Sequence, residues 1–212
     1  MPSFRLARGA DSSLEADMMS TFALGQMLVR RSGYGAMQLA GPFAFGTPPD
    51  RASADQLAAM VAARDEGLIA GVGLSNVSLE QLRHAAAGTV IVCVQNLFHL
   101  ADRRGTPLLA ECLSRGIAFV PFCPLGWPRG QDNPVLTSPV VIQAAARLGI
   151  TPAQAALQWL LQLAPNVLLI PGTGSVAHLR ENLAAEGVTL DDEALRELDA
   201  VAPWPDDPSR AV

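Results

Sequence analysis

Short apolar runs alternate with helical patterns along most of this chain. Four runs are hydrophobic at nearly every position, as is typical of strands that are buried on both faces. They cover residues 68–74, 90–94, 117–122 and 167–170, and a weaker run lies near residues 33–39. Each strong run is followed by a helical pattern, and strands that alternate with helices indicate a parallel sheet. The predicted fold class is therefore α/β.

The ends of several helices carry recognisable signals. Ser78 is a favourable N-cap, and Gln81 three residues later completes a capping box. Thr151 precedes Pro152, which suits the first turn of a helix, and Gly116 suits a helix end. The helical patterns cover residues 54–66, 79–87, 106–115, 153–163, 176–185 and 192–201.

Length and composition favour a single domain. The chain has 212 residues, of which 50% are hydrophobic, and this is enough for one sizeable core. We interpret residues 19–212 as one domain. Residues 1–18 are polar and aperiodic, so we interpret them as a flexible extension or as a misassigned upstream start.

Charge and hydropathy exclude two classes of partner. The net charge is −5 and no basic cluster occurs, whereas nucleic-acid binders need a concentrated positive face. No apolar run reaches the ~18 residues that a membrane-spanning helix needs. The first residues include Asp11, Glu15 and Asp17 and lack the apolar segment of a secretory signal. These features predict a cytoplasmic protein that binds neither nucleic acid nor membranes.

Counts of single residue types exclude several mechanisms. All 15 basic residues are arginine, and Tyr34 is the only tyrosine. A chain without lysine cannot supply a Walker phosphate loop, a Schiff-base lysine or a tyrosine–lysine acid–base couple. The three cysteines are odd in number and widely spaced, which suggests neither a disulfide framework nor a zinc site.

Polar and glycine-rich residues stand where the apolar runs stop. They are Ser75 and Asn76, Gln95 and Asn96, residues 122–126 and residues 171–175. In a parallel α/β fold the ligand site lies at the carboxyl ends of the strands. Amides and hydroxyls that converge there suit a carboxamide, and a glycine turn that leads into a helix suits a phosphate. The pattern predicts a nucleotide-like cofactor rather than a metal centre.

These segments resemble the aldo-keto reductase family, whose members are NADP-dependent oxidoreductases on a (β/α)8 barrel. The similar segments are GLIAGVGLSNVSLEQL, VQN, FCPLG, IPGTGSVAHLREN and, for the first strand, GYGAMQLAG, and the likeness covers about residues 19–202. The resemblance implies an incomplete TIM-type barrel with about five parallel strands and flanking helices. Their spatial order would be one, eight, seven, six, five, with a short hairpin before the first strand.

The resemblance also implies which residues contact the cofactor. Ser75, Asn76 and Gln95 would hold the nicotinamide, and Phe122 would stack on its ring. The phosphate and adenine contacts would come from Leu125, Gly172, Thr173, Glu181 and Asn182. Some relatives have a lysine for the 2′-phosphate of NADP at the position of Gly172, and many have an arginine at that of His178. The resemblance therefore implies NADP as the cofactor, and NAD is also possible.

The family's catalytic segments have no counterpart in this chain. Residues 48–51 resemble the entry into the first helix, but residues 54–67 already resemble the fourth. The skipped helices and strands carry the family's catalytic aspartate, tyrosine, lysine and histidine. The resemblance therefore implies an internally truncated carbonyl reductase with impaired catalysis. Three hypotheses stay open: activity with groups borrowed from a partner chain or from Cys123, a non-catalytic dinucleotide-binding remnant, and a gene-deletion product.

Simpler interpretations exist for single residues. Ser75 and Asn76 also suit an ordinary strand-to-helix turn. His84 and His99 are interpreted as surface or loop histidines, since neither is expected at a strand end beside a carboxylate. Cys123 is interpreted as an inert thiol rather than a reactive one. Trp127 and Trp204 suit either a substrate cleft or a hydrophobic rim.

An incomplete barrel has two open strand edges, and these predict self-association. Unpaired N–H and C=O groups on apolar strands invite pairing with another chain, and a closed five-stranded ring is too narrow for the side chains inside it. We expect a dimer or larger oligomer, or aggregation. Size-exclusion chromatography with light scattering measures this, and a compact monomer that melts cooperatively at micromolar concentration would contradict it.

Overall fold

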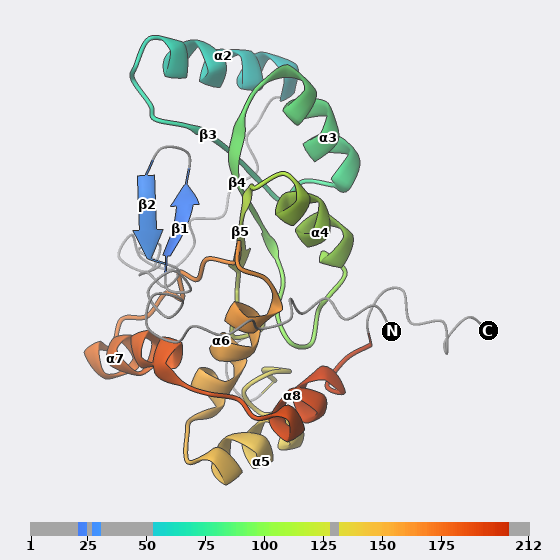
Figure 1. Ribbon diagram of the computed structural model, residues 1–212, viewed down its shortest axis with the longest axis vertical. Helices are drawn as coiled ribbons and strands as arrows, with labels where there is room; N and C mark the ends of the chain where they lie inside the picture. Colours follow the sequence, from blue (N-terminus) through green and yellow to red (C-terminus); the bar gives the residue numbers. More distant parts are fainter. Residues whose placement is uncertain (1–20, 25–26, 31–52, 128–131, 204–212) are drawn as a thin grey trace, which may run out of the picture.

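The computed structural model describes residues 21–24, 27–30, 53–127 and 132–203 (Figure 1). The predicted extension of residues 1–18 and the weak strand near residues 33–39 lie outside these ranges. The elements that follow are those of the described part of the chain.

Three parallel strands form the central sheet. They are β3 (Val72–Ser75), β4 (Ile91–Leu97) and β5 (Ala118–Phe122), in the order β3-β4-β5. A fourth segment continues the sheet beyond β5, where Val167 forms a parallel bridge with Phe119. This order confirms the predicted arrangement for the four strong apolar runs. Among the described residues, no strand pairs with the outer side of β3.

Seven α-helices and an antiparallel hairpin surround this sheet in the described part of the chain. The helices are α2 (Ser53–Asp65), α3 (Leu79–Gly88), α4 (Thr106–Ser114), α5 (Pro139–Leu148), α6 (Pro152–Leu163), α7 (Val176–Ala184), which the 3-10 helix η2 (Ala185–Gly187) follows, and α8 (Asp192–Asp199). The hairpin consists of β1 (Thr21–Leu24) and β2 (Met27–Arg30). No single helix within the described ranges is long and apolar enough to cross a membrane; α5 and α6 together reach that length and composition, but the chain bends by 92° between them.

The predicted helix starts are confirmed in atomic detail. The Ser78 hydroxyl accepts the N–H of Gln81 at 3.1 Å, and the Gln81 side chain accepts the N–H of Ser78 at 2.8 Å. Thr151 and Gln154 form a second reciprocal pair at 3.2 and 3.1 Å. Each capping box satisfies two backbone donors that a helix start otherwise leaves free.

Two strand starts and one helix differ from the predictions. The predicted runs began at residues 68 and 90, but β3 begins at Val72 and β4 at Ile91. Leu68 and Val90 are 73% and 71% exposed. Gly67 adopts φ +75° and the N–H of Leu68 returns to the C=O of Ala63 at 2.9 Å, so Leu68 belongs to the end of α2. The helix α5 was not predicted from the hydrophobic pattern, although a proline begins it and a left-handed glycine ends it.

One face of the sheet packs on the helices and forms the main core. Trp159 of α6 is fully buried and stacks on Phe98 with a ring-centroid distance of 6.5 Å and an interplanar angle of 13°. Phe98 in turn meets Phe119 of β5 edge to face at 5.7 Å. Each such ring contributes roughly 2–3 kcal/mol by burial alone. The core therefore joins α6 to the middle of the sheet through three aromatic rings.

The opposite face of the sheet has a smaller apolar cluster beneath the hairpin. Phe22 and Leu24 of β1 pack against Ala118 and Val120. The hairpin that the resemblance implied is thus present, and it packs on this face of the sheet.

Gly73 and Cys93 occupy neighbouring positions on this inner face. The two residues are in register between β3 and β4. A Cβ atom at Gly73 would lie 2.6 Å from the Cys93 Sγ, a distance that real contacts do not show. Cys93 therefore fills the space that the absent side chain of Gly73 leaves.

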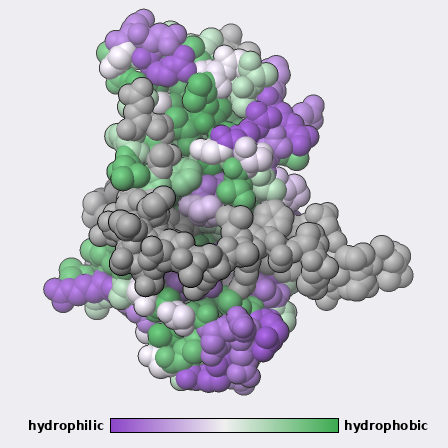
Figure 2. Space-filling view, in the orientation of Figure 1, coloured by the Kyte–Doolittle hydropathy of each residue, from purple (hydrophilic) through white to green (hydrophobic). Residues whose placement is uncertain are grey.

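Hydrophobic and hydrophilic residues gather over different elements on the face shown in Figure 2. On the face shown in Figure 2, hydrophobic residues reach the surface below α2, over the strands of the sheet, whereas α5 and α8 present a mainly hydrophilic surface. The hydrophilic end includes the contact between α5 and α8.

The side chain of Arg103 ties the β4–α4 loop to the end of α8. It is almost completely buried, and its guanidinium donates to the C=O groups of Leu100, Leu198 and Asp199 at 3.0, 2.8 and 2.8 Å. The guanidinium carbon also lies 4.6 Å from the centroid of the Trp159 ring, whose N–H donates to the Asp199 carboxylate at 2.8 Å. Arg103 thus adds donors to the carbonyls at the end of α8, where the C=O of Leu198 also accepts the N–H of Val201 at 3.2 Å.

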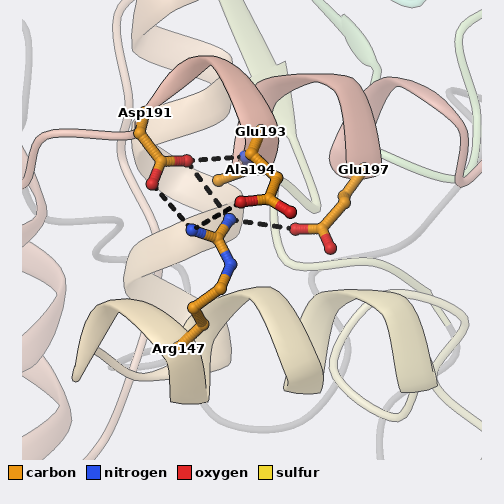
Figure 3. Close-up of polar contacts among 5 residues, drawn as sticks. All are labelled: Arg147, Asp191, Glu193, Ala194 and Glu197. Carbon is orange, nitrogen blue, oxygen red and sulfur yellow. Dashed lines mark hydrogen bonds and ion pairs between the residues drawn. The ribbon is translucent and has the colours of Figure 1, made fainter.

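Arg147 of α5 faces three carboxylates of α8 (Figure 3). Its guanidinium lies 2.7 Å from Asp191, 3.5 Å from Glu193 and 3.1 Å from Glu197. Asp191 is also the N-cap of α8 and accepts the N–H of Ala194 at 2.7 Å. The hydrogen bond from Arg147 lowers the pKa of Asp191 to about 2. These groups are exposed, so they act mainly by orienting α8 on α5.

We expect Arg103→Ala to lower the free energy of unfolding by about 3 kcal/mol, because it removes a buried guanidinium and its three hydrogen bonds to backbone carbonyls. The neighbouring Arg104 is a matched control, since its exposed side chain pairs with Asp102 at 2.6 Å. Arg104→Ala should cost no more than about 1 kcal/mol. Urea unfolding monitored by circular dichroism compares the two variants, and equal losses would contradict the assigned role of Arg103.

We expect the Arg147 cluster to make stability depend on acid pH. The ordinary pKa of Asp191 is 3.8 and its folded value is about 2, so its contribution is complete above about pH 5 and is lost as the pH falls towards 2. In Arg147→Gln the folded pKa of Asp191 should rise, and the fall in stability between pH 5 and pH 2 should become shallower. Urea midpoints measured across that range check this. Arg180→Gln, at an exposed arginine of α7, should keep the original pH profile.

Candidate functional site

The carboxyl ends of the strands meet at one edge of the sheet, as a parallel arrangement requires. Ser75 is in register with Gln95, and Gln95 is in register with Val120. Phe122 ends β5 opposite Leu97, two residues beyond Gln95 along β4. The strands therefore bring three of the predicted site residues to the same edge.

These three side chains share the inner face of the sheet. Side chains alternate along a strand, so Gln95 lies on the same face as Cys93, and Phe122 on the same face as Ala118. Ser75 is exposed, whereas Gln95 and Phe122 are half-buried. Within the described residues, neither the Ser75 hydroxyl nor the Gln95 carboxamide has a hydrogen-bond partner. A hydroxyl, a carboxamide and an aromatic ring are thus gathered on one open surface.

Two strand ends adopt left-handed backbone conformations without glycine. Asn76 has φ 54° and Cys123 has φ 52°. Asparagine tolerates this region, but for cysteine it costs about 1 kcal/mol. The N–H of Asn76 donates to the C=O of Gln95 at 2.8 Å, so the backbone of Asn76 still extends the sheet. Both residues turn the chain away from the strand directly beside the predicted site.

Asn96 holds the turn after β3, a role that the sequence did not indicate. Its Oδ1 accepts the N–H of Val77 at 3.1 Å, and its Nδ2 donates to the C=O of Val77 at 2.8 Å. The side-chain amide thus bonds both backbone groups of a residue nineteen positions earlier, as a neighbouring strand would. The signal available beforehand was a polar residue at a position that alternation directs towards the helices. The Asn96 amide is engaged, whereas that of Gln95 is not.

The predicted phosphate and adenine residues lie on another segment. Gly172 is exposed in the loop that leads to α7, and the Thr173 hydroxyl accepts the N–H of Ser175 at 3.1 Å. Ser175 caps α7, and its hydroxyl accepts the N–H of His178 at 3.4 Å, so helix geometry leaves the N–H groups of Val176 and Ala177 for an anion.

Glu181 and Asn182 follow in the second turn of α7. Asn182 is buried, and the C=O of Glu181 accepts the Gln154 side chain of α6 at 3.3 Å. Glu181 is thus joined to α6 through its backbone. Within the described residues, no hydrogen bond joins Glu181 or Asn182 to Ser75 or Gln95. The remaining predicted residue, Leu125, lies half-buried in the turn after β5.

The histidines differ in their surroundings. His84 is exposed, as predicted. His99 is a loop residue, which was one of the two predicted alternatives, but it is buried, with 3% of its surface exposed. Contrary to expectation it lies beside a carboxylate, that of Asp102, in a turn closed by two backbone hydrogen bonds. Burial lowers the pKa of His99, and its Nδ1 accepts the N–H of Ala101 at 3.2 Å. His99 is thus a neutral structural residue of the β4–α4 loop.

The three cysteines are free thiols. Burial raises the pKa of Cys93, and it raises that of Cys112 to about 12. Both therefore stay protonated at neutral pH and are poor nucleophiles. Trp127 is exposed in the loop after β5, and Trp204 lies outside the described residues.

Comparison with known proteins gives consistent results. The model of the Aldo/keto reductase family matches residues 43–203. Pyridoxine 4-dehydrogenase of Escherichia coli is 47% identical over 139 residues, which are 66% of this chain and 47% of that protein. An uncharacterized oxidoreductase of Schizosaccharomyces pombe is 39% identical over 68% of this chain and 46% of its own length. This chain therefore spans about half the length of the curated relatives it matches.

Solved structures give the same result for the fold. An aldo/keto reductase from Klebsiella pneumoniae, in complex with NADP and acetate, has a TM-score of 0.64 at 33% identity and covers 71% of this chain and 54% of that one. A thermostable aldo-keto reductase in complex with the inhibitor epalrestat has the same TM-score at 32% identity, covering 73% and 56%. The predicted fold class, an incomplete TIM-type α/β barrel, is confirmed.

Proposed function

Because this chain belongs to the aldo/keto reductase family, we propose that it binds NADP(H) at the carboxyl ends of its strands. The observation that carries the proposal is the pairing of Ser75 with Gln95 on the inner face, where both polar side chains are free of partners in the described part of the chain. Two aldo/keto reductases from Klebsiella pneumoniae, at 33% and 32% identity, were crystallised with NADP and NADPH, which supports this choice of cofactor.

The residues present fit such a dinucleotide. The Ser75 hydroxyl and the Gln95 carboxamide offer the donors and acceptors that a carboxamide needs, and the Phe122 ring offers an apolar face. Gly172, without a side chain, and Thr173 precede the capped start of α7, which suits a phosphate group. Asn76, Leu125, Glu181 and Asn182 complete the proposed contacts. NAD is the alternative cofactor, since neither Gly172 nor His178 supplies a fixed positive charge for a 2′-phosphate.

Catalysis by this chain alone is proposed to be slow. When bound, NADP(H) supplies hydride transfer to or from a carbonyl carbon. Proton transfer to the oxygen needs an acid of suitable pKa, and the chain has no lysine to tune a tyrosine. A thiol is no substitute at Cys93 or Cys112, because both are held protonated by burial. A non-catalytic dinucleotide-binding protein is therefore the second candidate function.

The proposed substrate is a small aldehyde or ketone. Among curated relatives, pyridoxine 4-dehydrogenase shares 47% identity with this chain over 139 residues. Aldehydes on a pyridine ring, such as pyridoxal, are accordingly the first compounds to test.

We expect NADPH to bind weakly and Gln95→Ala to weaken binding by about fivefold to tenfold, the loss of one or two hydrogen bonds. Gln143→Ala, at an exposed position of α5, is the matched control and should leave the affinity unchanged. Fluorescence titration and calorimetry measure the NADPH affinity of the unmodified chain and of the two variants. Absence of any signal at millimolar NADPH would refute the proposal.

The same preparations, given NADPH and pyridoxal, test turnover. General acid catalysis supplies ~100-fold to 10,000-fold, so we expect rates at least about 100-fold below those of complete relatives. A rate equal to theirs, in a preparation shown to contain none of them, would show that this chain obtains its acid from another source.

A further inference from the structure

The turn after β5 combines two unusual backbone conformations. Cys123 has φ 52° and Gly126 has φ 92°. The N–H of Gly126 closes the turn by donating to the C=O of Cys123 at 2.9 Å. A left-handed backbone conformation is unfavourable for cysteine, so we expect contacts from outside the turn to help to hold it.

Asn133 supplies that contact from beyond the turn. Its side chain is buried, with 3% of the residue exposed, and its Nδ2 donates to the C=O of Leu125 at 3.0 Å. Its Oδ1 accepts the N–H groups of Val135 and Leu136 at 2.9 and 2.7 Å. The Thr137 hydroxyl donates to the C=O of Asn133 itself. Both ends of the amide are thus engaged, which fixes its orientation.

The close approach of the turn to Asn133 depends on glycine. A Cβ atom at Gly126 would lie 2.9 Å from the Asn133 Oδ1 and 2.9 Å from a methyl group of Val135. A side chain would therefore push the turn away from Asn133. The turn and Asn133 form one packed unit.

We propose that Asn133 is a positioning residue of the cofactor site. It fixes the C=O of Leu125 and thereby the turn that carries Phe122 and Leu125, without itself touching the cofactor. The proposal rests on the proposed function, in which these two residues contact NADP(H). It adds to the site a residue from outside the strand ends, which acts on the cofactor only through the turn that it holds.

The chain offers a matched control at the other end of the same strand. Asn166 is also buried, and its Nδ2 donates to the C=O of Ile117, just before β5, at 2.9 Å. Asn133→Asp and Asn166→Asp each replace an N–H donor to a backbone carbonyl by an oxygen of the same shape. Both should lower the urea midpoint, but only the first loosens the turn at the carboxyl end.

The experiment measures NADPH affinity and amide hydrogen exchange of Gly126 in both variants. Asn133→Asp should raise the dissociation constant about tenfold and speed Gly126 exchange about tenfold, as expected for losing one buried hydrogen bond. Asn166→Asp should change each quantity less than about twofold. Unchanged NADPH affinity or unchanged Gly126 exchange in Asn133→Asp would overturn the inference, as would an equal loss of affinity in Asn166→Asp.

Two further comparisons make the result decisive. If Asn133→Asp does not fold, Asn133→Ser replaces it, because a serine hydroxyl accepts the same N–H groups but does not reach Leu125. The same changes in affinity and exchange are expected. If the unmodified chain does not bind NADPH, the proposed function fails. If it binds NADPH and the variants bind equally well, only the role of Asn133 fails.

Discussion

The pairing of β4 with a parallel neighbour on each side is the interaction on which the rest of this structure depends. It aligns the carboxyl ends of β3, β4 and β5, and it directs alternate side chains of each strand to opposite faces. One face then packs on α6 through Trp159, Phe98 and Phe119. The other face carries Ser75, Gln95 and Phe122. The candidate site and the main core thus lie on opposite faces of the same sheet.

Local signals in the sequence predicted the elements well. Capping residues such as Ser78 marked helix starts correctly, because their hydrogen bonds join residues three positions apart. The apolar runs located the strands, and the family resemblance supplied their order, but neither gave the first residues of β3 and β4. Leu68 and Val90 continue the hydrophobic pattern although they are exposed, and the glycine at position 67 was the local sign that Leu68 belongs to a helix end.

The sequence predicted only those residues of the candidate site that lie at the ends of adjacent strands. Ser75 and Gln95 meet because consecutive parallel strands pair, which the pattern already implied. The contacts of Asn96 with Val77 and of Asn133 with Leu125 connect turns to residues elsewhere in the chain. The left-handed conformation of Cys123 and the burial of His99 likewise follow from tertiary packing. Apart from the polar residue at a helix-facing position of β4, Asn96, the sequence carries no local sign of these contacts.

The contact between Gly73 and Cys93 limits how this sheet can evolve. The sulfur of Cys93 occupies the space that any side chain at position 73 would need. A larger residue at position 73 therefore requires that the Cys93 side chain rotate away or that a smaller residue replace it. The two positions therefore form a coupled pair, and among related sequences their substitutions should occur together.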